Sequence, residues 1–308
     1  MTLTRRQIVA GSASIAALGI TTPKFSRADG HVRSWRQYAS GGWGQVHLWM
    51  AEPASGLGNK TPLVCLHQSP TSGAYYKEFQ AVMAEDRLVI SPDTPGYGSS
   101  TKPTAQPDME DYGRACVEAL NDPGYGPGGD GGGDEGPVDV LGFHTGNFVT
   151  IEMARQQPGL VRKMVMPGIP YFPPDERQGK LEQYAGPRPY FSDPAYMEKS
   201  YLSLVYNNDN GVSKERQLEM FVERLRAGTT SHYGFNAVFR YNPDPVLKAL
   251  DKPVLLPILN ELLAEPTRFS GKMIRNASFI ELMDLDASVW FIGPERLTKV
   301  VRPFLDGT

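Results

Sequence analysis

The residues best placed to do chemistry are a histidine and the two glycines that bracket it. Residues 138–153 read VDVLGFHTGNFVTIEM, an apolar run followed by a turn and a helical pattern. Gly142 and Gly146 have the spacing of a nucleophile elbow, G-x-S-x-G, in which a sharp strand-to-helix turn exposes the nucleophile. The position that normally holds Ser, Cys or Asp holds His144. We therefore expect His144 to act as a general base, a general acid or a hydrogen-bond donor, or else to plug a former active site.

Short apolar runs alternate with helical patterns along the chain. The inner runs are continuous in Val, Leu, Ile and Met, which is typical of parallel strands buried on both faces. Helical spacing falls between them and again from Pro294 to the end. This alternation predicts a doubly wound α/β sheet. The predicted strands are 46–50, 63–66, 88–91, 138–141, 163–166, 254–258 and 278–282, and the helices include 108–121 and 147–157.

Two stretches interrupt the alternation. Residues 123–137 are mostly glycine, proline and acid, which predicts a flexible surface insertion. Residues 171–245 are rich in aromatic residues, proline and charge, with helical patterns at 194–205 and 214–227. Because this second stretch falls between two strands, we expect it to form a cap over the strand ends, where ligands bind in such sheets. Four aromatic residues are expected at the boundary between cap and core: Tyr171, Phe172, Tyr190 and Phe191.

Composition favours one globular domain. The chain has 308 residues, of which 40% are hydrophobic, and a net charge of −3. This charge gives no electrostatic reason to expect nucleic acid or an anionic membrane as partner. No apolar run reaches the length of about 20 residues that spans a bilayer.

The first 28 residues have the features of a twin-arginine signal peptide. Arg5 and Arg6 precede a modestly apolar stretch, and small residues near Ala28 suit a cleavage site. We therefore expect a periplasmic or secreted protein. Export permits a disulfide, but Cys65 and Cys116 both lie in apolar patterns and are expected to be small buried hydrophobes.

From about residue 40 to the end, the chain resembles the α/β-hydrolase superfamily, and in particular its cap-containing haloalkane dehalogenases, epoxide hydrolases and esterases. Four landmarks in order carry the resemblance: LHQSPTS at 66–72, RLVISPDTPGYGSS at 87–100, the elbow with the helix that follows it, and the final strand and helix around 252–254 and 304–305. The resemblance implies a core of residues 29–170 and 246–308, with a mostly parallel sheet and a helical cap, 171–245, inserted after the sixth strand.

The resemblance also implies a Ser-acid-His triad, and two of its positions depart from the pattern. His144 replaces the nucleophile, and Glu261 is the acid that follows the 254–258 strand. The catalytic histidine should lie in 283–293, where there is none, and Ala287 is near its position. A covalent serine-type mechanism needs both the nucleophile and the base.

Other parts of the family's site are expected to remain. The backbone N–H groups of Gln68 and Thr145 would form an oxyanion hole, which needs no particular side chain. His67 and Asp93 are expected to support the loops next to the pocket. His232 in the cap is a candidate substitute base, and Ser69 or Thr145 a displaced nucleophile. No metal or cofactor is expected, since His67, His144 and Asp93 do not have the spacing of a known metal motif.

These features predict a small-molecule hydrolase, lyase or isomerase that acts on a carbonyl substrate through the oxyanion hole and His144. Two alternatives stay open. One is a catalytically inactive protein that uses the same pocket to bind a ligand or partner. The other is an esterase with a relocated triad, in which Ser69 or Thr145 acts with His232 and Glu261.

Overall fold

The computed structural model describes residues 32–56, 60–122, 136–184 and 186–307. The predicted signal peptide, 1–28, and nearly all of the glycine-rich insertion, 123–137, lie outside the described residues. None of the helices in the described ranges is long and apolar enough to cross a membrane.

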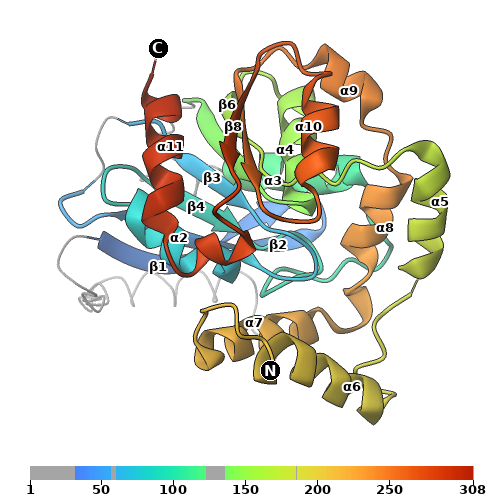
Figure 1. The fold of residues 1–308 in the computed structure, drawn as a ribbon. Helices are drawn as coiled ribbons and strands as arrows, with labels where there is room; N and C mark the ends of the chain where they lie inside the picture. Colours follow the sequence, from blue (N-terminus) through green and yellow to red (C-terminus); the bar gives the residue numbers. More distant parts are fainter. Residues whose placement is uncertain (1–31, 57–59, 123–135, 185, 308) are drawn as a thin grey trace, which may run out of the picture.

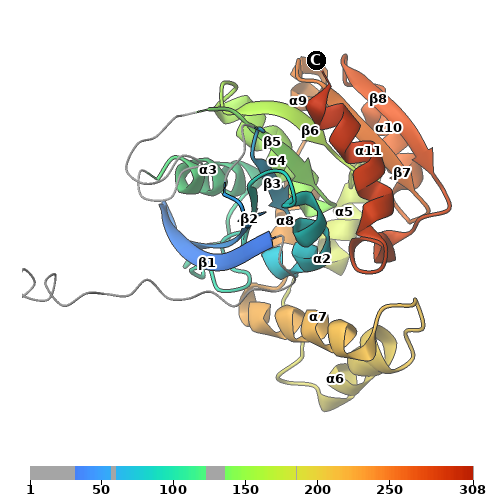
Figure 2. The ribbon, with the colours of Figure 1, turned by 90° about the vertical axis from the view of Figure 1, so that its left-hand side faces the viewer.

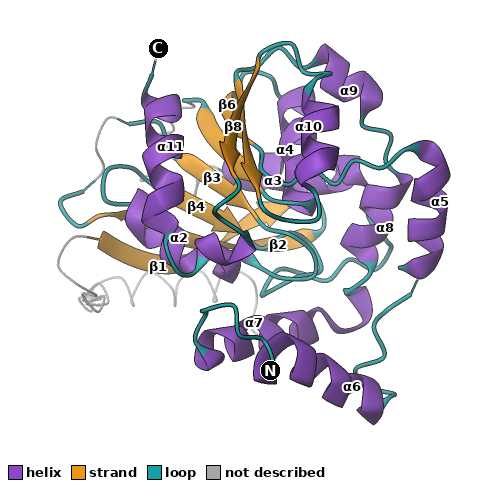
Figure 3. Ribbon diagram, viewed as in Figure 1, coloured by secondary structure: helices purple, strands orange, loops and turns teal. Residues whose placement is uncertain are grey.

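An eight-stranded, mostly parallel sheet forms the centre of the molecule, as the sequence predicts (Figure 3). Its strand order is β1-β2-β4-β3-β5-β6-β7-β8. Strand β2 pairs antiparallel with both β1 and β4, and the other pairs are parallel. The strands are β1 Val32–Gly41, β2 Gly44–Pro53, β3 Leu63–Leu66, β4 Val89–Pro92, β5 Val138–Gly142, β6 Val161–Val165, β7 Val254–Leu259 and β8 Ala277–Leu282.

Helices cover both faces of the sheet (Figures 1 and 2). One buried apolar layer joins the sheet to α2 (Lys77–Met83) and α11 (Pro294–Asp306). The other joins it to α3 (Met109–Leu120) and α4 (Thr145–Gln156). Helix α10 (Ala264–Gly271) packs beside β7. The doubly wound prediction is therefore confirmed.

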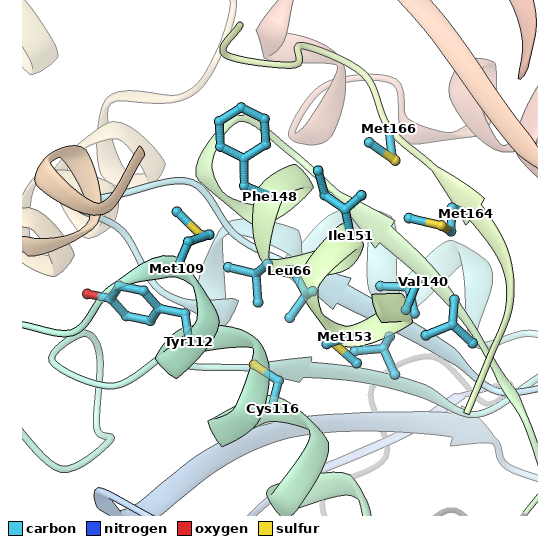
Figure 4. Close-up of a cluster of buried hydrophobic side chains, with 14 of the residues drawn as sticks. Leu66, Met109, Tyr112, Cys116, Val140, Phe148, Ile151, Met153, Met164 and Met166 are labelled. Carbon is cyan, nitrogen blue, oxygen red and sulfur yellow. The ribbon is translucent and has the colours of Figure 1, made fainter. Parts of the chain in front are cut away.

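The layer beneath α4 fixes the position of the elbow. The first ten residues of this helix are all buried, so its start cannot shift without disturbing the core. Figure 4 shows side chains of α3 and α4 packed over the strands that flank them. Its labelled residues are Leu66, Met109, Tyr112, Cys116, Val140, Phe148, Ile151, Met153, Met164 and Met166.

Five helices lie between β6 and β7. They are α5 Pro174–Gln183, α6 Pro194–Tyr201, α7 Lys214–Ala227, α8 Tyr233–Arg240 and α9 Asp244–Ala249. Helices α8 and α9 contact α4, and α5 contacts α8. Helices α6 and α7 lie together below the rest of the molecule in Figure 1. Arg216 of α7 joins this pair to the core, because its guanidinium binds Glu78 and the Ala74 carbonyl.

Candidate active site

The elbow has the strained backbone that its motif predicts. His144 has φ 49° and ψ −115°, and it is the non-glycine residue with positive φ among those described. The two glycines are required by close packing. A Cβ on Gly142 would lie 2.7 Å from the Asn147 backbone, and one on Gly146 would overlap the Leu66 carbonyl. The turn therefore holds the histidine at the carboxyl end of β5, between β5 and α4.

His144 forms a short ion pair or hydrogen bond with the predicted acid. Its Nε2 lies 2.6 Å from Oε2 of Glu261, which follows β7. The Glu261 side chain is 9% exposed and that of His144 is 26% exposed. The imidazole also packs on the ring of Phe143, with 4.0 Å between centroids. The acid therefore contacts the elbow residue directly, without the intervening histidine of a triad.

The space around this pair depends on Gly168, which follows β6. Gly168 has φ +65°, and a Cβ there would lie 2.7 Å from Cδ2 of His144 and would overlap Oε1 of Glu261. That Oε1 is buried and has no hydrogen-bond partner among the described residues. Because Gly168 has no side chain, the Glu261 carboxylate and the His144 imidazole can contact each other.

The loop after β8 supplies no base to the site. Residues 283–293 contain a 3₁₀ turn, Ala287–Trp290, that buries Trp290 in the layer beneath α11. Ala287 and Ser288 line a cavity between the core and α7. The segment in which the resemblance implies a triad histidine thus contributes two small side chains to the wall of this cavity.

The loop after β3 aims one backbone amide at the elbow. The Gln68 carbonyl accepts hydrogen bonds from Thr71 N, Thr71 Oγ1 and His67 Nδ1, at 3.1, 2.6 and 3.0 Å. The C=O and the N–H of one peptide unit point in opposite directions, so these three bonds also fix the Ser69 N–H. That N–H lies 3.3 Å from Thr145 Oγ1 at the start of α4.

The predicted oxyanion donors, Gln68 and Thr145, each have a backbone N–H without an acceptor in the described part of the chain. Among the described residues, neither the Gln68 nor the Thr145 backbone N–H donates a hydrogen bond to another residue. Gln68 lines the cavity below α7. The Ser69 N–H already donates to Thr145 Oγ1, so it is not free to bind an oxyanion. The oxyanion-hole role of Gln68 and Thr145 stays a prediction.

His67 and Asp93 are parts of the framework next to the site. His67 Nε2 accepts a hydrogen bond from the Thr94 amide at 3.0 Å, and burial lowers its pKa. The Asp93 carboxylate accepts from His47 Nδ1, Trp49 Nε1 and the amides of Gly73 and Ser99, at 2.7–3.0 Å. Although burial opposes it, the bonds from His47 and Ser99 hold the pKa of Asp93 below its usual value. Asp93 therefore ties β2 and two loops together.

His232 does not meet the acid. It lies just before α8, its Nδ1 is buried without a hydrogen-bond partner, and burial lowers its pKa. The hydrogen bonds of the described residues include none from His232 to Glu261, Ser69 or Thr145. The relocated triad is therefore not assembled, because Glu261 is already paired with His144.

The predicted boundary aromatics divide into two groups. Tyr171 and Phe172 pack on Phe269 and Phe239. Tyr190 packs among the helices between β6 and β7, on Phe221 and Tyr196. Phe191 does not line a boundary: it is 74% exposed, because the turn that buries Tyr190 directs the next side chain outward. Cys65 and Cys116 are both buried free thiols.

No protein-family model matches the chain, but solved structures do. It is similar to a thermophilic esterase from Thermogutta terrifontis, with a TM-score of 0.68 and 17% identity over 88% of this chain and 98% of that one. An enol-lactonase from Burkholderia xenovorans LB400 gives 0.65 and 15%, over 88% and 100%. An epoxide hydrolase gives 0.67 and 19%, over 89% and 99%. The predicted α/β-hydrolase fold is thereby confirmed.

Proposed function

We propose that this protein hydrolyses a small carbonyl substrate by activating water with a dyad of His144 and Glu261. The observation that carries the proposal is the 2.6 Å contact between His144 Nε2 and Glu261 Oε2 at the elbow. A carboxylate beside Nε2 favours the tautomer with its proton on Nε2, which leaves the lone pair on Nδ1. Nδ1 has no hydrogen-bond partner among the described residues and belongs to a side chain that is 26% exposed. A histidine that only filled a former active site would instead have this nitrogen buried.

The proposed reaction is a general-base hydrolysis. Nδ1 of His144 takes a proton from water while the water oxygen forms a bond to the substrate carbonyl carbon. The resulting imidazolium is stabilised by the Glu261 carboxylate. The tetrahedral intermediate then collapses, its C–O bond to the leaving group breaks, and the imidazolium returns the proton to the leaving oxygen. The products are a carboxylic acid and an alcohol, or a hydroxy acid from a lactone.

The negative charge on the tetrahedral oxygen needs donors that are already in place. The N–H groups of Thr145, at the start of α4, and of Gln68, in the loop after β3, have no acceptor among the described residues. Backbone donors of this kind contribute about 3–4 kcal/mol each to transition-state stabilisation. We assign this role to the backbone N–H groups of Thr145 and Gln68, neither of which donates to another described residue, while the Gln68 carbonyl anchors the loop.

The test is turnover of a panel of activated esters and lactones by residues 29–308, the chain without its predicted signal peptide. Those substrate classes are chosen because an esterase and an enol-lactonase share the fold. We expect His144→Ala to lower kcat/KM by about 10²–10⁴-fold, the range for loss of a general base. His232→Ala, at a second partly buried histidine, is the matched control and should retain turnover.

Two outcomes would contradict the proposal. Equal turnover by the wild type and His144→Ala would place the chemistry elsewhere. Absence of turnover in both, across the whole panel, would favour the alternative of a ligand-binding protein.

A further inference from the structure

A cavity of about 170 Å³ lies between the core and α7, and Gln68 belongs both to its wall and to the proposed active site. From the core it is lined by Gln68, Tyr75 and Ala287. From the cap it is lined by residues of α7 and of the segment before it. Of the described residues in its wall, Arg224 is the one that carries a charge.

Arg224 differs from the other arginines of α7 in having no partner. Arg216 pairs with Glu78 and Glu219, and Arg226 pairs with Glu223. Among the described residues, Arg224 forms no ion pair and donates no hydrogen bond. Arg224 is partly buried, and this burial lowers its pKa. A guanidinium that faces a cavity without a counter-ion has N–H donors free to bind an anion.

The remainder of the wall suits an organic anion. Several side chains are apolar, and no carboxylate of the described residues lines the cavity to repel a negative ligand. A guanidinium binds a carboxylate through two parallel N–H···O bonds, while apolar walls hold the carbon skeleton. The apolar lining residues are Leu204, Val212, Met220, Phe221, Ala287 and Phe291.

Tyr75 connects this cavity to the dyad. Its ring stacks on Phe143, the neighbour of His144, with 5.9 Å between centroids, and its edge meets Phe291 in the cavity wall at 4.9 Å. Burial raises the pKa of Tyr75; the charge of Arg224 opposes this shift and that of Glu261 adds to it. One tyrosine therefore lies within electrostatic reach of both groups.

We infer that Arg224 binds a carboxylate of the substrate, so that the protein acts on an ester or lactone of a small organic acid that keeps one free carboxylate. This inference rests on the proposed function for the reaction, but the anion subsite itself does not require turnover. Arg224 would hold the free carboxylate at the cap while the scissile carbonyl lies at the elbow.

The direct test is isothermal titration of the chain of residues 29–308 with acetate, succinate, glutarate and benzoate, beside the uncharged amides of the same acids. We expect at least one carboxylate to bind while its amide does not. Arg224→Gln should weaken that binding by about tenfold or more, since a charge-assisted pair is lost. Arg226→Gln, an exposed arginine on the same helix, is the matched control and should bind as the wild type does.

Several outcomes would overturn the inference. These are the absence of carboxylate binding by the wild type, equal binding of acids and amides, and binding that survives Arg224→Gln. If Arg224→Gln fails to fold, as judged by its thermal unfolding, Arg224→Lys keeps the charge and should bind more weakly through one contact. His144→Ala should still bind the carboxylate, which separates failure of this subsite from failure of the proposed reaction.

Discussion

The two ring nitrogens of His144 have different surroundings, and this difference defines their proposed roles. Nε2 contacts a carboxylate that is nearly buried, whereas Nδ1 has no partner among the described residues. The ring is held from the side by Phe143. In this arrangement Glu261 is a positioning residue, because it acts on the substrate only through the imidazole.

The direct effect of replacing Glu261 should therefore be a change in the tautomer of His144. Glu261→Gln keeps the shape but offers an amide that can donate to Nε2, so the Nδ1 lone pair is no longer favoured. We expect kcat to fall by about 10²-fold or more with little change in KM. Nitrogen-15 NMR of the imidazole should show the proton moving from Nε2 to Nδ1. Glu265→Gln, at an exposed carboxylate on α10, is the control.

An unchanged nitrogen spectrum in Glu261→Gln would contradict this role, whatever the rate. The sequence placed Glu261 after its strand correctly, but not its contact with His144. That contact depends on the length of the glutamate side chain and on the room left by Gly168, which no local pattern encodes.

Among the elements, the loop after β3 and the loop after β4 behave as one unit. Asp93 joins His47 and Trp49 of β2 to the amides of Gly73 and Ser99, and His67 is bonded to Thr94. These bonds hold the loop that carries the Gln68 amide. Stability and alignment of the proposed oxyanion donors should therefore depend on one buried carboxylate.

Asp93→Asn should destabilise the protein by about 2–4 kcal/mol at pH 7, because the amide turns a donor toward groups that already donate. The folded-state pKa of Asp93 lies below its unfolded value. Its contribution is thus complete above the unfolded pKa of about 4 and is lost as the pH falls through the folded value. Urea unfolding at pH 7 and at pH 3 should show the difference between wild type and variant shrinking at low pH.

Asp251→Asn, at an exposed aspartate, should leave stability unchanged at both pH values. A difference between wild type and Asp93→Asn that is independent of pH would argue against the ionised carboxylate as its source.

Predictability differs between elements for physical reasons. The predicted ends of the inner strands lie within three residues of the observed ends, and those of β3 coincide with them, because burial on both faces requires continuous apolar runs. The sequence missed β1, an edge strand in which Ala39 is the one buried residue, so no apolar run marks it. It also missed α5, whose residues are not buried and therefore carry no apolar stripe.

At the scale of the whole molecule, each of the two cysteines lies in a different apolar layer, so its reactivity measures the opening of that layer. Cys116 lies in the layer beneath α3 and α4, and Cys65 in the layer beneath α2 and α11. Burial raises the pKa of Cys116 to about 12 and raises that of Cys65 as well. Neither thiol should therefore ionise in the folded protein near neutral pH.

We expect both thiols to be unreactive toward an aromatic disulfide reagent at pH 8 until the chain unfolds, since access requires global opening. In guanidinium chloride both should react, and the reaction should follow the loss of far-ultraviolet circular dichroism. Fast labelling of one thiol in the native protein would show that its layer opens separately. Cys116→Ala identifies which layer that is.

The small residues Ala287 and Ser288 have a consequence for how this protein could change over time. In a triad enzyme the loop after the last strand must keep its histidine, so substitutions there endanger the reaction itself. Here the proposed base is carried by the elbow, and Ala287 and Ser288 of the loop contribute to the cavity wall. Catalysis and substrate specificity would then depend on separate segments of the chain. Substitutions at Ala287 and Ser288 could change which organic acid the substrate contains, while the reaction stays the same.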